Sequence, residues 1–436
     1  MKNISRVAAV AAIAALATTG LTVTAANAAV KTVTIYGGYA ASDASAFQDE
    51  LDIAFPAKSG IKVKYTSLAS FDTDITTKIK AGQAPDIAMW PQPGGLLAQK
   101  SKLVPLDKVL GAATLSKYIK TFVPGFELLG KSGNTTYGLP VSGNLKSIVF
   151  YNPAVFKENG WKVPTTGAAF TALQAQIKAS GKAYPWCAGT ESGGATGWSL
   201  TDWMEELVLK NYGTTVYNKW WKGEIKWTDS RIVKAGNQLA ATLLADGQTQ
   251  GGGQGVASRF FGLASTQGLF KDTKAEGACA LLKQGSFITA FFPDAIQAEI
   301  KAGNYAHVGV FAYPTPVGGQ SAVLGGGDTA AVFHNTPAVQ AVAKFIFSDK
   351  LGTHGYASKA SGFLSPHKTF NPAYFSTPLA KKFQSIFNNA SGFGFDGSDQ
   401  APPLVNKTEW SELTNWFAGQ KTQAQAFQLI ADAYNG

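Results

Sequence analysis

Acidic and aromatic side chains stand together near the middle of the chain, in a pattern that can bind polyols. Trp198 and Asp202 are four residues apart, so on a helix they share one face. An indole packs on the C–H face of a sugar ring, and a carboxylate accepts hydrogen bonds from its hydroxyls. Glu191 lies just before this segment, and Asp396 and Asp399 form a second acidic pair.

These residues also fit other interpretations, which the sequence leaves open. Two carboxylates can serve a glycosidase if they stand roughly 5 Å or roughly 6.5–9.5 Å apart, a geometry that a sequence does not give. The pair Asp396 and Asp399 also fits a capped turn. Trp198 can instead be a core aromatic residue, and for Trp203, on another helix face, core packing is favoured.

Other catalytic and cofactor chemistry lacks support. Gly125–Ser132 spells a phosphate-binding loop, but Pro124 precedes it, and bulky side chains fill the positions where the backbone should wrap a phosphate. No G-x-S-x-G motif of a serine hydrolase is found. The histidines lack the spacing of a zinc site; they are His307, His334, His354 and His367. We therefore expect no metal, cofactor or nucleotide.

Length and composition describe a folded protein with more than one domain. The chain has 436 residues, of which 45% are hydrophobic and 15% charged, and this composition excludes intrinsic disorder. The formal net charge is +10. The lysines are scattered singly, without the basic clusters and interleaved aromatic residues of a nucleic-acid site. We expect no nucleic-acid partner.

The N-terminus predicts export. Residues 1–28 read as a signal peptide, with Lys2 and Arg6 before an apolar segment and Ala26-Asn27-Ala28 as the cleavage motif. The apolar segment is shorter than the ~20 residues that span a bilayer. No cysteine follows it, so a lipid-anchor signal is absent, and we expect a periplasmic or cell-surface protein.

The chain has two cysteines, Cys187 and Cys279. In an exported protein, two cysteines suggest one disulfide, and two buried free thiols are the alternative. There is no C-x-x-C motif, so redox catalysis has no support.

Strand and helix patterns alternate from residue 31 onward. Strands are predicted at 31–36, 61–65 and 86–90, with helical faces at 47–55 and 71–79 between them. This order predicts a parallel sheet flanked by helices. The pattern restarts near residue 147, and further strands are predicted at 147–151, 286–292 and 308–311. We therefore expect two α/β units.

Residues that follow the strands are candidates for a binding site, because ligands of open α/β sheets bind beyond the carboxyl ends of the strands. Gly38 and Tyr39 follow the first predicted strand, Trp90 ends the third, and Phe292 ends the strand at 286–292.

Several segments resemble extracellular solute-binding proteins (family 1) of carbohydrate ABC transporters, in their maltose and α-glucoside branch. Their order covers the mature chain: Lys80–Ile87 with its G-x-x-P-D stretch, Tyr137–Val141, Tyr151–Pro153, Cys187–Trp203, Gly285–Ala290 and Phe395–Asp399. This resemblance implies a type II periplasmic-binding-protein-like fold, with two lobes joined by a hinge. Each lobe would be a mainly parallel sheet flanked by helices.

The resemblance also implies a division of the chain and a function. Residues 29–142 with 285–322 would form the N-terminal lobe, and 143–284 with 323–436 the C-terminal lobe. The protein would be a monomer and not an enzyme. It would close on an oligosaccharide or glucoside and deliver it to membrane permease subunits. A secreted carbohydrate-active enzyme and the same fold with a non-sugar solute are the alternatives.

The expected binding residues fall into three groups. The resemblance implies stacking on Trp90, Trp198 and Phe292, and hydroxyl acceptors at Glu191, Asp202 and Asp396. The remaining candidates line the rim or donate from the crossing segments: Gly38, Tyr39, Gln92, Asn144, Lys146, Gly326, Asp328 and Asp399. Pro91-Gln92-Pro93 stands where maltose binders have charged residues, so the sugar itself stays open.

Overall fold

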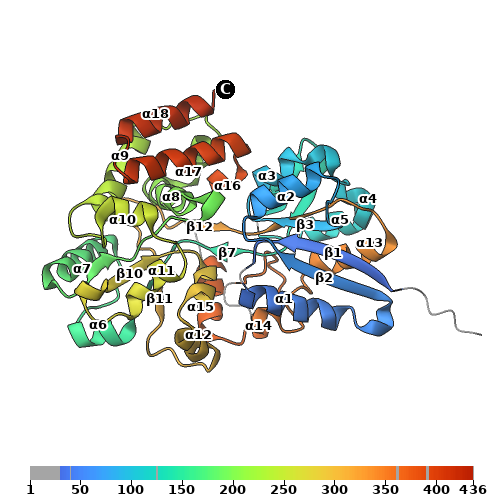
Figure 1. Ribbon diagram of the computed structural model, residues 1–436, viewed down its shortest axis with the longest axis horizontal. Coiled ribbons are helices and arrows are strands. Elements are labelled where there is room, and N and C mark those ends of the chain that lie inside the picture. Colours follow the sequence, from blue (N-terminus) through green and yellow to red (C-terminus); the bar gives the residue numbers. More distant parts are fainter. Residues whose placement is uncertain (1–29, 40, 124–125, 360–362, 389–391, 436) are drawn as a thin grey trace, which may run out of the picture.

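The computed structural model describes residues 30–39, 41–123, 126–359, 363–388 and 392–435. The predicted signal peptide and Gly125 of the phosphate-loop-like segment lie outside these ranges. Two α/β lobes stand side by side, with the N-terminal strands in one and the C-terminal helices on the other (Figure 1). The two-lobe fold predicted from the resemblance is confirmed.

The first lobe contains a five-stranded sheet in the order β2-β1-β3-β13-β6. These strands are β1 (Lys31–Gly37), β2 (Ile61–Ser67), β3 (Ile87–Trp90), β6 (Gly138–Pro140) and β13 (Thr329–Val332). The helices of this lobe are α1 (Ala41–Ala54), α2 (Phe71–Lys80), α3 (Pro93–Ala98), α4 (Leu106–Leu110), α5 (Ala112–Ile119), α13 (Pro337–Ile346) and α14 (Tyr356–Lys359). Phe47 and Leu51, four residues apart on α1, are fully buried, as their helical spacing predicts.

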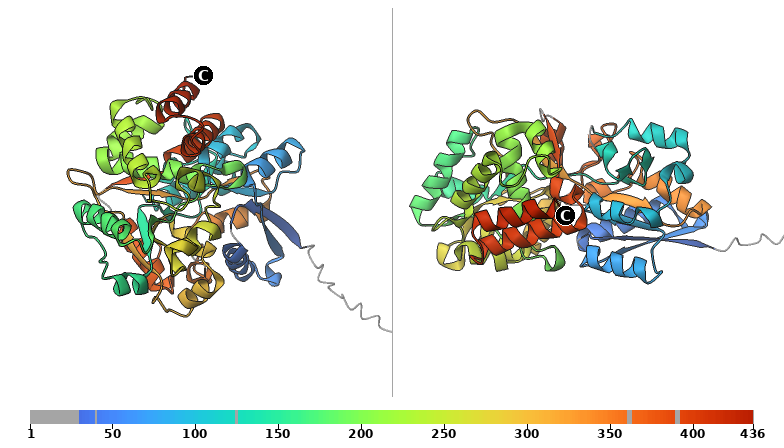
Figure 2. Two further views of the ribbon diagram at one scale, coloured as in Figure 1. Left: turned by 60° about the vertical axis from the view of Figure 1, so that its left-hand side comes forward. Right: turned by 90° about the horizontal axis from the view of Figure 1, so that it is seen from above.

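The second lobe contains a four-stranded sheet in the order β11-β8-β10-β9. Its strands are β8 (Ile148–Tyr151), β9 (Tyr184–Trp186), β10 (Cys279–Lys283) and β11 (Gly309–Ala312). Its helices are α6 (Pro153–Asn159), α7 (Gly167–Ser180), α8 (Trp198–Trp221), α9 (Ser230–Leu239), α10 (Gly252–Ser258), α11 (Leu263–Thr266), α12 (Asp294–Lys301), α15 (Pro378–Asn388), α16 (Gly397–Gln400), α17 (Pro403–Phe417) and α18 (Gln423–Ala433). Seen from above, the two lobes again lie side by side (Figure 2, right).

A small third sheet, β14-β12-β7, lies where the chain passes between the lobes (Figure 1). It consists of β7 (Asn144–Leu145), β12 (Val323–Gly326) and β14 (Phe393–Phe395). The segment before β7 and the segment after β12 are tied together, because the Ser142 hydroxyl donates to the Asp328 carboxylate at 2.6 Å. The Asp328 amide donates back to the Ser142 oxygen at 3.0 Å.

The strand pairing corrects two predictions. Both large sheets are mixed and not mainly parallel, because β13 runs antiparallel to β3 and β6, and β8 runs antiparallel to β10 and β11. The predicted first-lobe stretch 285–322 contains β11, which pairs with β8 of the second sheet. The chain returns to the first sheet only at β13. Local patterns define a strand but not its partner, which tertiary packing selects.

The strand predicted at 286–292 is wrong. Ser286–Phe291 forms a 3₁₀-helix, in which Ser286 and Thr289, three residues apart, are buried. A short apolar segment fits a buried strand and a buried helical turn equally well by its pattern.

The lobes touch where α3 meets the end of α16. A Cβ atom built on Gly94 of α3 would lie 2.1 Å from the carbonyl oxygen of Ala401. No side chain fits at this distance, so glycine permits the two backbones to meet here.

Cys187 and Cys279 form a disulfide, which confirms the predicted pairing. It joins the residue after β9 to the first residue of β10, so it fixes the start of the segment that leads to α8. None of the helices in the described ranges combines the length and apolar character needed to cross a membrane.

Candidate functional site

A cavity of about 670 Å³ is lined by residues of both lobes. On the first lobe, its wall forms where β1, β2 and β3 end. Gly38 and Tyr39 follow β1, Ser70 precedes α2 after β2, and Gln92 follows β3. Because these strands are parallel, their carboxyl ends lie at one edge of the sheet, as the strand-end rule requires.

The first-lobe wall combines acidic and hydroxyl groups with apolar side chains such as Leu68 and Phe71. Asp43 and Asp72 come from the first turns of α1 and α2, and Ser67, Ser70 and Thr73 add hydroxyls. Burial raises the pKa of Asp72 to about 6, and the charge of Lys407 partly offsets this effect. With its amide nitrogen turned toward Asp72, Gln92 donates to both carboxylate oxygens, at 3.1 and 3.2 Å.

The second-lobe wall is aromatic. It is formed by Trp198, Phe260, Phe261, Phe287 and Phe291. The Trp198 ring centroid lies 5.0 Å from that of Phe261, at 75°, and 5.8 Å from that of Phe287. Phe261 also lies 5.1 Å from Phe291. Edge-to-face contacts of this kind hold the rings in fixed orientations and leave a broad apolar surface.

A buried ion network lies behind Trp198. Lys146, which follows β7, donates to Asp202 of α8 at 2.8 Å and also to Asp396. Its ammonium lies 5.4 Å from the centroid of the Trp198 ring. These three charged residues are at most 4% exposed. The aromatic ring therefore lies beside a cation that is paired with two acidic side chains, and burial raises the pKa of one of them, Asp202, to about 7 despite the charge of Lys146.

The network sets different protonation states for its acids. Burial alone would raise the pKa of Asp396, but Lys146 holds it well below its usual range. Burial raises the pKa of Asp399, and the neighbouring charge of Asp396 raises it further. The Asp396 carboxylate also accepts the amide of Asp399 at 3.0 Å, which caps α16. Asp399, which lines the cavity, therefore favours its protonated, donating form.

The structure brings most of the predicted binding residues to this cavity. Those that line it are Gly38, Tyr39, Gln92, Asn144, Lys146, Glu191, Trp198, Asp328 and Asp399. Lys146 and Asn144 are also engaged within the protein. The Asn144 side-chain oxygen accepts the amide of Gly326 at 3.0 Å, and this bond links β7 to β12.

Five predicted residues do not line the cavity. Trp90 is 1% exposed and packs between Phe71 and Phe333, and Phe292 is 2% exposed and packs against Phe150. Asp202 and Asp396 are turned to Lys146, behind Trp198. Gly326 is held in β12, and its neighbour Gly327 lines the cavity instead.

The sequence reasoning missed several lining residues. Asp43 and Asp72 carried a usable signal, because each is an acid in the first turn of a helix that follows a strand. Phe260, Phe261, Phe287 and Phe291 lie on loops and a short 3₁₀-helix, where no period indicates which side chain faces the cavity. Tyr356 and Phe363 come from a late segment that returns to the first lobe.

The chain is similar to known extracellular binding proteins. The family model described as bacterial extracellular solute-binding protein matches residues 24–352. The alpha-glucosides-binding periplasmic protein AglE of Rhizobium meliloti is 32% identical over 411 residues, which are 93% of this chain and 87% of AglE. The osmoprotective compounds-binding protein GgtB of Synechocystis sp. is 32% identical over 394 residues, 89% of each chain.

Solved structures share the fold at lower identity. A chitin oligosaccharide binding protein has a TM-score of 0.73 at 20% identity, with 93% of this chain and 98% of that chain covered. Maltose-bound MalE3 of T. maritima has a TM-score of 0.67 at 16% identity, with 93% and 99% covered.

Proposed function

The chain belongs to the bacterial extracellular solute-binding protein family, and from this premise we propose that it is the sugar-binding component of an ABC importer for an α-glucoside or related oligosaccharide. The observation that carries the proposal is one cavity in which acids and hydroxyls of the first lobe lie opposite a cluster of aromatic rings of the second lobe. Sugar rings have both kinds of surface, with apolar C–H faces and a polar hydroxyl rim.

In this proposal each wall recognises a different part of the ligand. The ring stacks on Trp198 of the second lobe, while its hydroxyls donate to Asp43, Asp72 or Asp328 on the opposite side. Because the two sets of contacts come from different lobes, both form only when the lobes are closed. The ligand then shifts the open–closed equilibrium by its differential affinity for the closed form, and the permease recognises that form.

The internal pairing of the acids supports binding rather than catalysis. Two of the three acids that a glycosidase interpretation would use, Asp202 and Asp396, are committed to Lys146, which leaves Glu191 alone of the three at the cavity. In the proposal the protein binds its ligand unchanged, acts as a monomer outside the membrane and transfers the ligand to permease subunits.

The similarity to GgtB favours a second candidate ligand class, the osmoprotective solutes, because GgtB matches this chain at the same 32% identity as AglE. We include in this candidate class only osmoprotective solutes that are polyols, because these also combine hydroxyls with apolar C–H surface.

A ligand panel tests the proposal. We expect thermal shift and calorimetry of the mature protein to identify an α-glucoside or a neutral osmoprotective solute among mono-, di- and oligosaccharides, polyamines and metals. A ligand at 100 times its dissociation constant adds ~2.7 kcal/mol to the free energy of unfolding. The ligand recovered afterwards should be chemically intact. Binding of a polyamine or metal alone, or recovery of cleaved sugar, would contradict the proposal.

A further inference from the structure

The aromatic wall of the cavity is carried by two irregular segments that run side by side. Segment 187–197 leads from the disulfide to α8, and segment 259–262 leads from α10 to α11. The Thr190 amide donates to Val256 at 3.0 Å, the Glu191 amide to Arg259 at 2.9 Å, and the Phe261 amide to Glu191 at 3.1 Å. These bonds place Glu191 and Phe261 next to each other at the cavity.

The side chain of Arg259 joins this pair of segments to a third. One terminal nitrogen of its guanidinium donates to the carbonyl of Ala188 at 2.8 Å, and the other donates to the carbonyl of Gln250 at 2.9 Å. Ala188 lies directly after the disulfide-bonded Cys187, and Gln250 lies before α10. A single half-buried side chain therefore fixes the spacing of three backbone segments behind the wall.

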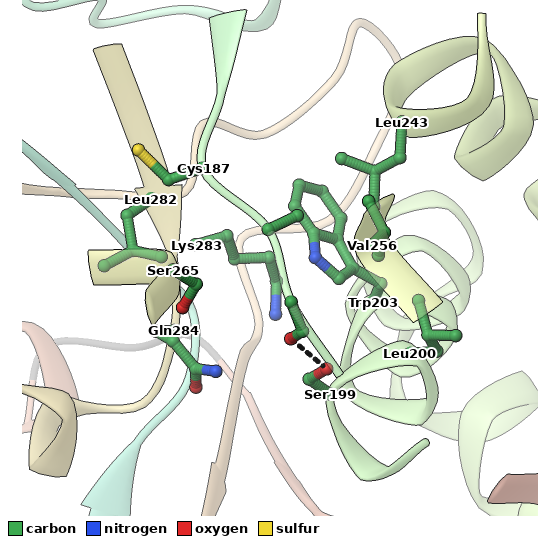
Figure 3. A pocket seen from close by; sticks show the side chains of 12 residues that line it. Cys187, Ser199, Leu200, Trp203, Leu243, Val256, Ser265, Leu282, Lys283 and Gln284 are labelled. Carbon is green, nitrogen blue, oxygen red and sulfur yellow. Dashed lines mark hydrogen bonds between the residues drawn. The ribbon is translucent and has the colours of Figure 1, made fainter. Parts of the chain in front are cut away.

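The packing around this contact leaves little room for adjustment. A Cβ atom on Gly189 would lie 2.7 Å from the Arg259 carbonyl oxygen and 2.9 Å from that of Phe260. From the opposite side, the Ser199 hydroxyl donates to the Gly189 carbonyl at 3.0 Å, drawn as the dashed line in Figure 3. Only a cavity of about 10 Å³ remains there, lined partly by Ser199, Trp203 and Lys283.

Arginine is an unusual choice in this chain, which has three arginines, Arg6, Arg231 and Arg259, among 38 basic residues. Arg6 lies outside the described residues. Arg231 is partly exposed on α9 and pairs with Asp229 two residues earlier. Arg259 alone of the two described arginines spans separate segments. A planar fork serves two carbonyls in fixed directions, whereas the ammonium of lysine is a point charge on a flexible stem.

We propose that Arg259 is a positioning residue for ligand binding, which sets the register of segments 187–191 and 259–261 so that Glu191, Phe261 and Trp198 present one continuous surface. This inference rests on the proposed function. Arg259 itself does not line the cavity and acts through the residues that do. Loss of the fork lets the aromatic wall move relative to Trp198, with which Phe261 makes its edge contact.

The test compares R259K and R259A with R231K as the matched control. With the sugar found in the ligand panel, we expect R259K and R259A to raise Kd about tenfold and R231K to leave it unchanged. Millimolar methylguanidine should restore most of the affinity of R259A, because it supplies the missing fork, while methylamine should not. Melting temperatures measured alongside separate a loss of positioning from a loss of folding.

A readout without ligand keeps the inference separate from the proposed function. The emission of Trp198 is obtained by subtracting the spectrum of a Trp198→Phe partner from that of each protein. We expect its maximum and its acrylamide quenching to change in R259K but not in R231K. If the wild type binds no sugar, the proposed function fails, and this spectrum still decides the role of Arg259.

Two outcomes would overturn the inference. One is an R259K protein with wild-type affinity, or, where no sugar binds, with wild-type Trp198 emission. The other is an affinity loss that follows the melting temperature and is not rescued by methylguanidine, since that result describes a general structural role. If R259A fails to fold, R259K and its Trp198 spectrum provide the decision.

Discussion

The two walls of the cavity are built in opposite ways. The first-lobe wall presents Asp43, Asp72 and serine hydroxyls beside the ring of Phe71, and behind it Trp90 packs between Phe71 and Phe333. The second-lobe wall has an aromatic face, and behind Trp198 lies a buried ion network centred on Lys146. The first wall is thus backed mainly by apolar packing, and the second mainly by charged side chains.

This difference shows two ways of making a rigid binding surface. Close packing of aromatic rings holds the short polar side chains of the first wall, since a dry core permits few rotamers. Directional charge-assisted hydrogen bonds hold α8 and α16 behind the second wall, where the exposed rings need a fixed base. The two supports should therefore fail differently when they are mutated.

Removing the cation of the ion network should have the largest effect. Lys146→Met leaves Asp202 and Asp396 buried without the cation that pairs with both, and breaking such a pair costs about 3–5 kcal/mol. We expect a loss at the upper end of this range in urea unfolding. The triple variant Lys146→Met, Asp202→Asn, Asp396→Asn should recover much of it, because no uncompensated charge remains. A stable Lys146→Met protein would show that the ion network does not support the wall.

Truncating Trp90, behind the first wall, should lower the free energy of unfolding by a similar amount with and without ligand. Trp90→Ala removes a side chain that is 1% exposed, and we expect a loss of about 3–5 kcal/mol in the free energy of unfolding. The check is chemical denaturation with and without the sugar. Unchanged stability together with abolished binding would mean that Trp90 contacts the ligand and that the first wall is not apolar behind its face.

The matching substitution on the second wall should act on affinity. Trp198→Ala removes the stacking surface, and we expect Kd to rise about tenfold to a hundredfold, measured by calorimetry. Trp221→Ala is the control, since Trp221 lies at the far end of α8 and does not line the cavity. Equal Kd values for the Trp198→Ala and wild-type proteins would remove Trp198 from the binding surface.

The first wall should show the smallest effect, in the pH dependence of stability. Burial raises the folded pKa of Asp72 to about 6, above the usual aspartate value of 3.8, so between about pH 4 and 6 the folded state holds more protons than the unfolded state. Stability therefore falls as pH rises through this window, by about 1 kcal/mol after allowance for solvent in the cavity. Asp72→Asn should flatten the profile of melting temperature against pH.

The Lys407→Met variant should act in the opposite direction. The charge of Lys407 lowers the pKa of Asp72, so its removal should deepen the fall in stability. Identical pH profiles for all three proteins would show that Asp72 is not desolvated at the cavity.

The parts of the site that follow parallel strands were predictable from sequence. Gly38, Tyr39 and Gln92 lie at the cavity because β1 and β3 are adjacent and parallel, so their ends share one edge. The prediction that Trp90 stacks on a ligand does not agree with its position, because the side chain is buried in the first lobe. All four residues of β3 are buried, so an aromatic residue at the end of this strand packs into the core and not into the cleft.

The second wall was less predictable because it depends on contacts distant in sequence. Phe292 lies in the core and its neighbour Phe291 at the cavity, and a 3₁₀-helix that resembles a strand in its pattern decides between them. Asp202 and Asp396 are 194 residues apart, and only the folded chain brings both to Lys146. The cysteine pairing was simpler, since two cysteines allow one intramolecular bond.

The contact between Gly94 and the Ala401 carbonyl has a practical consequence for engineering. The two backbones are in direct contact there. A methyl group at position 94 would therefore push α3 away from the end of α16. Residue 94 does not line the cavity. We therefore expect a substitution there to change the angle between the lobes without contacting a ligand. Graded side chains at this position would adjust the working range of a fluorescent biosensor built on this scaffold.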